Sequence, residues 1–238
     1  MDRGAVGLHI WDGNARLARI NQSSGAADKV QREVNVQLDS GGSAILDLHA
    51  LVQGSVAPEW RHRYEADATR DERVVADLGR EFPGFTLIQG GNSVATQGLD
   101  DIERAVAVNV RGRAPNFARQ EHEVLSMSVT PEVRLTPSYA SLSRRNYDVR
   151  LHGIPARKDT FVVKLPVGFH VVALPKDDSA ESKFGKFAIR SETRANKVTV
   201  RTSIELLTER VSPEEYAAFR SFCADVDRAL EPRLQIGR

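Results

Sequence analysis

An alternating strand followed by a strongly marked helix, between Asn196 and Leu230, constrains the fold more than any other stretch. Every second side chain of the strand belongs to one face, which carries apolar residues and one threonine. These residues are Val198, Val200, Thr202, Ile204 and Leu206. Apolar side chains then recur at helical spacing over residues 213–230. The pattern predicts a sheet with one buried face and a helix that covers it.

The start of this helix has two signals. Ser212 and Glu215 have the spacing of a capping box, in which each side chain accepts a hydrogen bond from the other residue's backbone amide. Pro213 suits the first helical position, where an amide would have no partner. We therefore expect the Ser212 hydroxyl to accept a bond from the Glu215 amide.

Other helices are expected only in one insertion near residues 58–82. Thr69 and Glu72 have capping-box spacing for the second of its two helices. Short alternating ladders joined by turns fill the rest of the chain, which is typical of antiparallel sheets packed as a sandwich. The expected fold is mainly β (α+β): antiparallel, β-sandwich-like sheets with a helical insertion near 58–82 and a C-terminal covering helix at 213–230.

Turn signals predict two hairpins within this pattern. Residues 34–52 alternate on both sides of a polar turn at 39–42. Residues 161–173 alternate on both sides of Pro166-Val167-Gly168. We expect the two strands of each stretch to pair with one another.

The N-terminal stretch is expected to be the end of something larger. Apolar pieces around Asp12-Gly13 predict a hairpin, and the small polar residues up to Asp28 are typical of a linker. A two-stranded hairpin cannot fold alone. The expected organisation is residues 1–28 as the end of a preceding unit plus linker, 29–155 as a β-rich subdomain with the two-helix insertion, and 156–238 as a β-sandwich-like subdomain with the C-terminal helix.

Composition narrows the classes of function. With 33 basic and 32 acidic side chains the formal net charge is +1, so no net field favours nucleic acid or a membrane. A single cysteine rules out an internal disulfide framework. No apolar run approaches the ~18 residues of a membrane span, so we expect none. The first residues lack the basic start and apolar core of a signal peptide.

Cys223 is the one residue that could act as a thiol nucleophile, with a histidine as its base. It lies on the apolar stripe of the last helix, where a free cysteine packs as a small hydrophobe, so we expect it to be buried and inert. The six histidines are scattered: His9, His49, His62, His122, His152 and His170. No metal-ligand spacing is present. We therefore assign no catalytic, cofactor-binding or metal-ligating residue and expect no cofactor.

Four other clusters have ordinary structural interpretations. Gly90-Gly91-Asn92 is expected to be a turn, and the acidic residues at 100–103 a solvated turn, because calcium needs about six to eight oxygens. Because the chain as a whole is nearly neutral, Arg144-Arg145 is expected to be the solvent-exposed end of a strand and not a nucleic-acid site. Trp60 and Tyr64, at i and i+4, are expected to pack their helix on the sheet.

Five short sequence segments follow one another along residues 30–238. They are Ala57-Pro58-Glu59-Trp60-Arg61, Tyr139-Ala140-Ser141-Leu142-Ser143-Arg144-Arg145, Lys164-Leu165-Pro166-Val167-Gly168-Phe169, Phe184-Gly185-Lys186-Phe187 and Val211-Ser212-Pro213-Glu214-Glu215-Tyr216-Ala217-Ala218-Phe219-Arg220. Together they resemble the C-terminal β-rich region of bacterial transglutaminase-like proteins. Those proteins have an N-terminal β-rich domain of unknown function and a transglutaminase/cysteine-protease-like core. The opening Met1-Asp2-Arg3-Gly4-Ala5 resembles the last segment of that core.

The resemblance implies a non-catalytic accessory region, because the family's catalytic Cys, His and Asp would lie before residue 1. Cys223 follows every histidine and matches no nucleophile motif. The implied role is scaffolding or binding, with the core and the N-terminal domain of the same parent protein as partners and a protein or cell-envelope ligand as a further candidate. The family's secretion signals imply a periplasmic or extracellular location. The alternative is a self-contained thiol hydrolase, which needs Cys223 exposed and within hydrogen-bond reach of a histidine.

Overall fold

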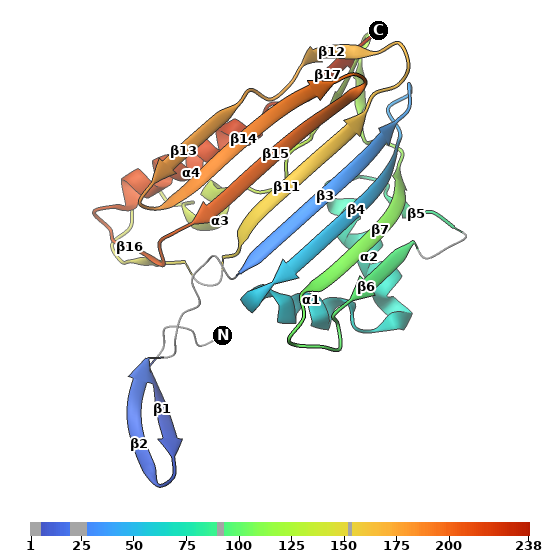
Figure 1. Ribbon diagram of the computed structural model, residues 1–238. Coiled ribbons are helices and arrows are strands. Elements are labelled where there is room, and N and C mark those ends of the chain that lie inside the picture. Colours follow the sequence, from blue (N-terminus) through green and yellow to red (C-terminus); the bar gives the residue numbers. More distant parts are fainter. Residues whose placement is uncertain (1–5, 20–27, 90–92, 152–153) are drawn as a thin grey trace.

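A nine-stranded sheet forms the body of the protein in the computed structural model, which describes residues 6–19, 28–89, 93–151 and 154–238 (Figure 1). Across the sheet the strands are β13 (Asp178–Ser182), β14 (Gly185–Arg194), β15 (Lys197–Leu206), β11 (Ala156–Lys164), β3 (Lys29–Leu38), β4 (Ala44–Gln53), β7 (Val106–Ala114) and β5 (Thr86–Leu87), and β6 (Val94–Gln97) also pairs with β7. The predicted β-rich fold class is confirmed.

One pairing at the centre of this sheet is parallel. β3 runs alongside β11 from Lys29↔Ala156 to Gln37↔Lys164, whereas the other described pairings in the sheet are antiparallel. The sheet is thus mostly antiparallel, as expected, and the parallel pairing of β3 with β11, which we call the seam, is an addition that alternation could not predict, because alternation identifies the face of a strand but not its partner. The expected boundary at residue 155 falls between strands of this single sheet.

Helices cover one face of the sheet and leave the other open (Figure 1). α1 (Ala57–Tyr64) lies over β4 and β7, next to α2 (Asp67–Glu81), and α4 (Tyr216–Leu230) lies over β13 and β14. The covered face of each strand carries the core: Val34 and Val36 of β3 meet Phe161 and Val163 of β11 across the seam, and all four are buried. Burial of this face stabilises the sheet–helix packing.

A second, four-stranded sheet closes part of the same face. Its strands are β12 (His170–Ala173), β17 (Leu234–Gly237), β9 (Val124–Met127) and β8 (Arg119–Glu121). The remaining described elements are the pair β10 (Val149–Arg150) and β16 (Arg210–Val211), the turn η2 (Gly54–Val56), the short helix α3 (Leu135–Tyr139), and the N-terminal pair β1 (Val6–Trp11) and β2 (Asn14–Arg19). No helix of the described residues combines the length and apolar character needed to cross a bilayer.

Both predicted hairpins near the N-terminus are confirmed. β3 and β4 pair over ten residue pairs around the turn at 39–42. β1 and β2 pair around Asp12 and Gly13, whose positive φ angles of 42° and 76° suit a two-residue hairpin turn. The expected linker lies mostly outside the described residues.

The predicted hairpin at 161–173 is wrong. β11 is flanked by β3 and β15, so neither of its edges is open to β12. β12 pairs instead with β17 in the second sheet. The turn at Pro166-Val167-Gly168 therefore carries the chain from one sheet to the other. Local sequence does not determine this outcome, because it depends on which strand edges the whole fold leaves open.

The predicted helix starts need two corrections. α2 begins at Asp67, so Thr69 lies inside its first turn, where its amide donates to the Ala66 oxygen. Only half of the capping box at α4 forms: Ser212 N donates to Glu215 Oε2 at 3.4 Å, but the Glu215 amide donates to the Ser212 carbonyl oxygen at 3.2 Å and not to its hydroxyl. α4 accordingly begins at Tyr216.

Replacing Phe219 with alanine is expected to cost about 3–5 kcal/mol of unfolding free energy, because the ring is fully buried and leaves a cavity. Its ring packs edge-on against Phe184 with centroids 5.5 Å apart. Chemical denaturation measures the cost, and Arg220→Ala on the exposed face is the control, expected within about 0.5 kcal/mol. Equal stability of the two variants would contradict docking of α4.

Candidate functional site

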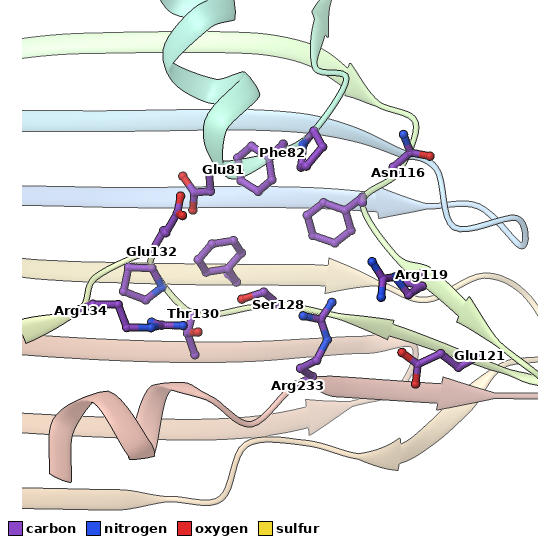
Figure 2. Close-up of a pocket in the computed structure, with 14 residues that line it drawn as sticks. Glu81, Phe82, Asn116, Arg119, Glu121, Ser128, Thr130, Glu132, Arg134 and Arg233 are labelled. Carbon is purple, nitrogen blue, oxygen red and sulfur yellow. The ribbon is translucent and has the colours of Figure 1, made fainter. Parts of the chain in front are cut away.

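A cavity of about 530 Å³ opens where the end of α2, the large sheet and the second sheet meet (Figure 2). Three buried phenylalanines line it: Phe82 after α2, Phe117 after β7, and Phe161 on β11. The rings of Phe82 and Phe117 stack with centroids 5.8 Å apart. The volume falls within the range of small-molecule sites, which are mostly apolar with a few placed polar groups.

Charged side chains surround this aromatic floor. In Figure 2, Arg119, Arg233 and Glu121 lie toward one end of the cavity, while Glu81, Glu132 and Arg134 lie toward the other, so each end carries both signs of charge. Arg233 donates to the hydroxyl and carbonyl oxygens of Ser126 at 3.0 and 3.3 Å. Within the described part of the chain, Arg119 and Glu132 have no side-chain hydrogen bond or ion pair. Their charges are therefore available to a ligand.

The wall of the cavity beside Glu81 is a buried charge network. Arg32 on β3 binds Glu81 through both of its terminal nitrogens, with Nη2–Oε1 at 2.7 Å. Its Nε donates to Asp159 Oδ1 at 2.8 Å, and Arg157 donates to both oxygens of the same carboxylate. Asp159 lies directly opposite Arg32 across the parallel seam and is only 1% exposed. The network ties α2 to the two strands.

The partners of Arg32 stabilise the charged form of its guanidinium. Burial opposes the charge, but the hydrogen bonds and charges of Glu81 and Asp159 outweigh it and raise the pKa of Arg32. The guanidinium also lies over the Phe161 ring, 5.7 Å from its centroid. A buried pair of this kind adds little net stability against an apolar replacement, but removal of one partner leaves the other charge uncompensated.

A second cavity of about 370 Å³ lies between α1, α2 and the sheet, and shares Glu81 and Glu132 with the first. Asp77 in its wall accepts hydrogen bonds from Arg63 and, at 2.8 Å, from Tyr64 Oη. Burial opposes the Asp77 charge, but these bonds outweigh it and lower its pKa. Burial and the bond to Asp77 raise the pKa of Tyr64. This cluster fixes α1 on α2.

Cys223 is fully buried, as predicted from its place on the apolar stripe. Burial, and then the carboxylate of Asp227, raise the pKa of the thiol to about 12, so it is protonated at neutral pH. The described histidines lie on other elements: His9 on β1, His49 on β4, His62 on α1, His122 in the β8–β9 turn and His170 on β12. His152 lies outside the described residues. Cys223 therefore lacks the exposed thiolate that a nucleophile needs.

The other predicted clusters have structural roles where the structure describes them. Trp60 and Tyr64 pack edge to face at 5.7 Å on the core, as expected. Asp101 accepts the amide of Glu103 at 3.0 Å, so its carboxylate closes the turn. Arg145 lies over the Tyr216 ring at 5.8 Å. The predicted turn at 90–92 lies outside the described residues.

Sequence reasoning missed the charge network and the cavity. A signal for the network was present, because Arg32 alternates with Val30 and Val34 and so falls on the buried face of its strand. Asp159 likewise alternates with Phe161. A charged residue at an inward position predicts a buried partner. The sequence contains no local pattern for the cavity, because its lining comes from segments far apart in the chain.

Residues 125–235, from β9 to β17, match the model of a domain of unknown function with a solved structure (DUF3858). This match supports the resemblance at the level of a domain of unknown function in the C-terminal half. No match to a curated protein reaches significance.

Two solved structures show weak likeness to the chain. One is described as a "putative protease" from Parabacteroides distasonis, with 19% identity, a TM-score of 0.41 and coverage of 50% of this chain and 24% of that chain. The chain thus spans about a quarter of that protein's length. The other is baculovirus P35, with 8% identity, a TM-score of 0.21 and coverage of 87% of this chain and 95% of that one. Neither likeness is close enough to assign a function.

The native protein is expected to resist thiol reagents at neutral pH, because Cys223 is buried with a raised pKa. Labelling followed by mass spectrometry should show modification only after denaturation. Cys223→Ala should cost on the order of 1 kcal/mol through lost packing. Stoichiometric labelling of the folded protein within minutes would refute burial.

Removing one member of the buried network is expected to be severe. Arg32→Ala leaves the largely buried Glu81 carboxylate without its partner and Asp159 with Arg157 alone, and should cost about 3–5 kcal/mol. Arg111→Ala, which breaks a largely exposed pair with Asp47, is the control and should cost about 0–1 kcal/mol. Urea denaturation compares the unfolding free energies of the two variants. Similar midpoints would show that the Arg32 network is not desolvated.

Proposed function

We propose that the chain is a non-catalytic accessory module of a bacterial transglutaminase-like protein, with a scaffolding or binding role in the periplasm or outside the cell. The observation that carries the proposal is the uncovered apolar face of the β1–β2 hairpin. The match of residues 125–235 to a domain of unknown function supports it.

The hairpin is amphipathic. Leu8 pairs with Leu17 and Ile10 with Ala15, so these apolar side chains share one face. Leu8, Ile10 and Leu17 are 59%, 67% and 73% exposed. An uncovered apolar face on so small an element indicates an interaction site. By resemblance, the partner is the end of a transglutaminase-like core that this hairpin completes.

The opposite face of the hairpin is structured differently. His9 stacks on Trp11 with ring centroids 4.9 Å apart, and the Arg16 guanidinium lies 5.5 Å from the Trp11 ring. Trp11 is 41% exposed, less than Leu8, Ile10 and Leu17 on the other face. The Leu8 face is therefore the more apolar and more exposed of the two, and the better candidate for a partner.

The alternative of a self-contained thiol hydrolase finds less support. Cys223 is fully buried with a pKa near 12. The described residues that line the larger cavity include hydroxyls, arginines and carboxylates but neither cysteine nor histidine. This lining favours holding a small charged ligand over the aromatic floor rather than breaking a bond.

The region encoded upstream in the same reading frame, produced separately, is expected to bind this chain and raise its melting temperature, because it stabilises only the folded state. Leu8→Ser combined with Leu17→Ser should abolish the complex, while Arg16→Ser on the other face should keep it. Size-exclusion chromatography and thermal denaturation measure both effects.

Two outcomes would contradict the proposal. One is a stop codon directly upstream, or an upstream frame without a Cys…His…Asp core. The other is amide hydrolysis or crosslinking by the chain alone that disappears in Cys223→Ser, which would establish the thiol hydrolase instead.

A further inference from the structure

The open face of the large sheet ends in a row of residues that contains no carboxylate. Strand register places one residue from each of six adjacent strands side by side at this end. The row, which we call the terminal row, consists of Arg113, Ile45, Gln37, Lys164, Lys197 and Arg194. With strands about 4.8 Å apart, it extends over roughly 24 Å.

Three neighbouring members of this row have the same charge. Lys164 lies directly opposite Lys197, and Lys197 directly opposite Arg194. Like charges at directly opposed positions destabilise a sheet. Lys164 and Lys197 are exposed and have no ion pair within the described chain. An arrangement that costs stability without a local partner points to a partner outside the chain.

Carboxylates begin only in the next row. Asp47 and Glu192 lie there, and each contacts arginine: Asp47 with Arg111 at 3.4 Å, and Glu192 with Arg194 at 2.5 Å. Asp39, in the nearby β3–β4 turn, accepts hydrogen bonds from the backbone amides of Gly41 and Ser43. Arg194 is therefore partly neutralised, while the two lysines are not.

An apolar tip projects at the same end. Val167, three residues after Lys164, is fully exposed. Its loop adjoins the β14–β15 turn, because the Leu165 amide donates to the Asn196 carbonyl oxygen at 2.8 Å. Gly168 continues the turn with a φ of 81°. The end of the sheet thus combines a broad cationic row with an exposed valine.

We propose that this end of the sheet docks on an anionic membrane surface. Peripheral binding combines attraction of lysine and arginine to anionic headgroups with burial of apolar side chains at the interface. A row of side chains that spans six strands over about 24 Å suits a broad anionic surface, and the fully exposed Val167 provides the apolar contact. β3 begins at the opposite end of the sheet, so the N-terminal side of the chain remains free (Figure 1).

Vesicles of phosphatidylcholine with phosphatidylglycerol, and of phosphatidylcholine alone, test the proposal by co-sedimentation with the full chain. Binding is expected to the anionic vesicles only, and to weaken as salt screens the charges. The triple variant Lys164→Gln, Lys197→Gln and Arg194→Gln should lose about fivefold in affinity per cation, roughly a hundredfold in all. Its melting temperature should stay equal or rise, since opposed like charges are removed.

A matched control removes the same charge elsewhere: Lys158→Gln, Arg150→Gln and Arg220→Gln, all exposed and outside the terminal row. It should bind the anionic vesicles within about twofold of the native chain, since charges beyond a Debye length contribute little. Val167→Ser should weaken binding severalfold even in high salt, because the lost contact is apolar.

Absence of binding to anionic vesicles would overturn the proposal, as would equal losses in the triple variant and its control. Soluble polyglutamate distinguishes the remaining partner class. If the native chain binds polyglutamate through the terminal row but not the vesicles, the surface serves an acidic protein and the membrane proposal fails.

Discussion

The parallel pairing of β3 with β11 is the interaction on which the rest of the structure depends. It joins strands from the two halves of the chain into one sheet. At this seam Arg32 meets Asp159, and Glu81 from α2 completes the network, so the helical insertion is fixed to both halves. The seam also places Phe161 at the floor of the larger cavity. Compared with an apolar pair, a buried ion pair adds little net stability, but a shifted register would separate Arg32 from Asp159 and leave buried charges uncompensated.

The strand register of the large sheet also produces the terminal row. A chain of net charge +1 has no overall field, yet alignment of six strands gathers cations into one row and displaces carboxylates to the next. The cavity, the terminal row and the apolar hairpin face use different residues. The partner site and the membrane-docking surface that we propose therefore do not overlap, and the buried Cys223 lines neither cavity.

Local patterns predicted the elements and some pairings between strands adjacent in sequence, but not the pairings between distant strands. Alternation located β14, β15 and the β3–β4 hairpin, and helical spacing located α4, because each depends on neighbours in sequence. The pairing of β12 with β17 could not be predicted, since competition for strand edges is decided by the whole fold. The half-formed capping box at Ser212 shows the same limit, because a correct spacing did not fix which oxygen accepts the amide. The cavity and the terminal row likewise depend on long-range register.

Native-state hydrogen exchange tests most directly whether the seam makes the sheet one cooperative unit. The account predicts that the amides of β3 and β11, including those of Val34 and Val163, exchange last and with one common free energy of opening. Exchange of β11, β14 and β15 at a clearly lower free energy than β3, β4 and β7 would show two independent units, and would contradict the account.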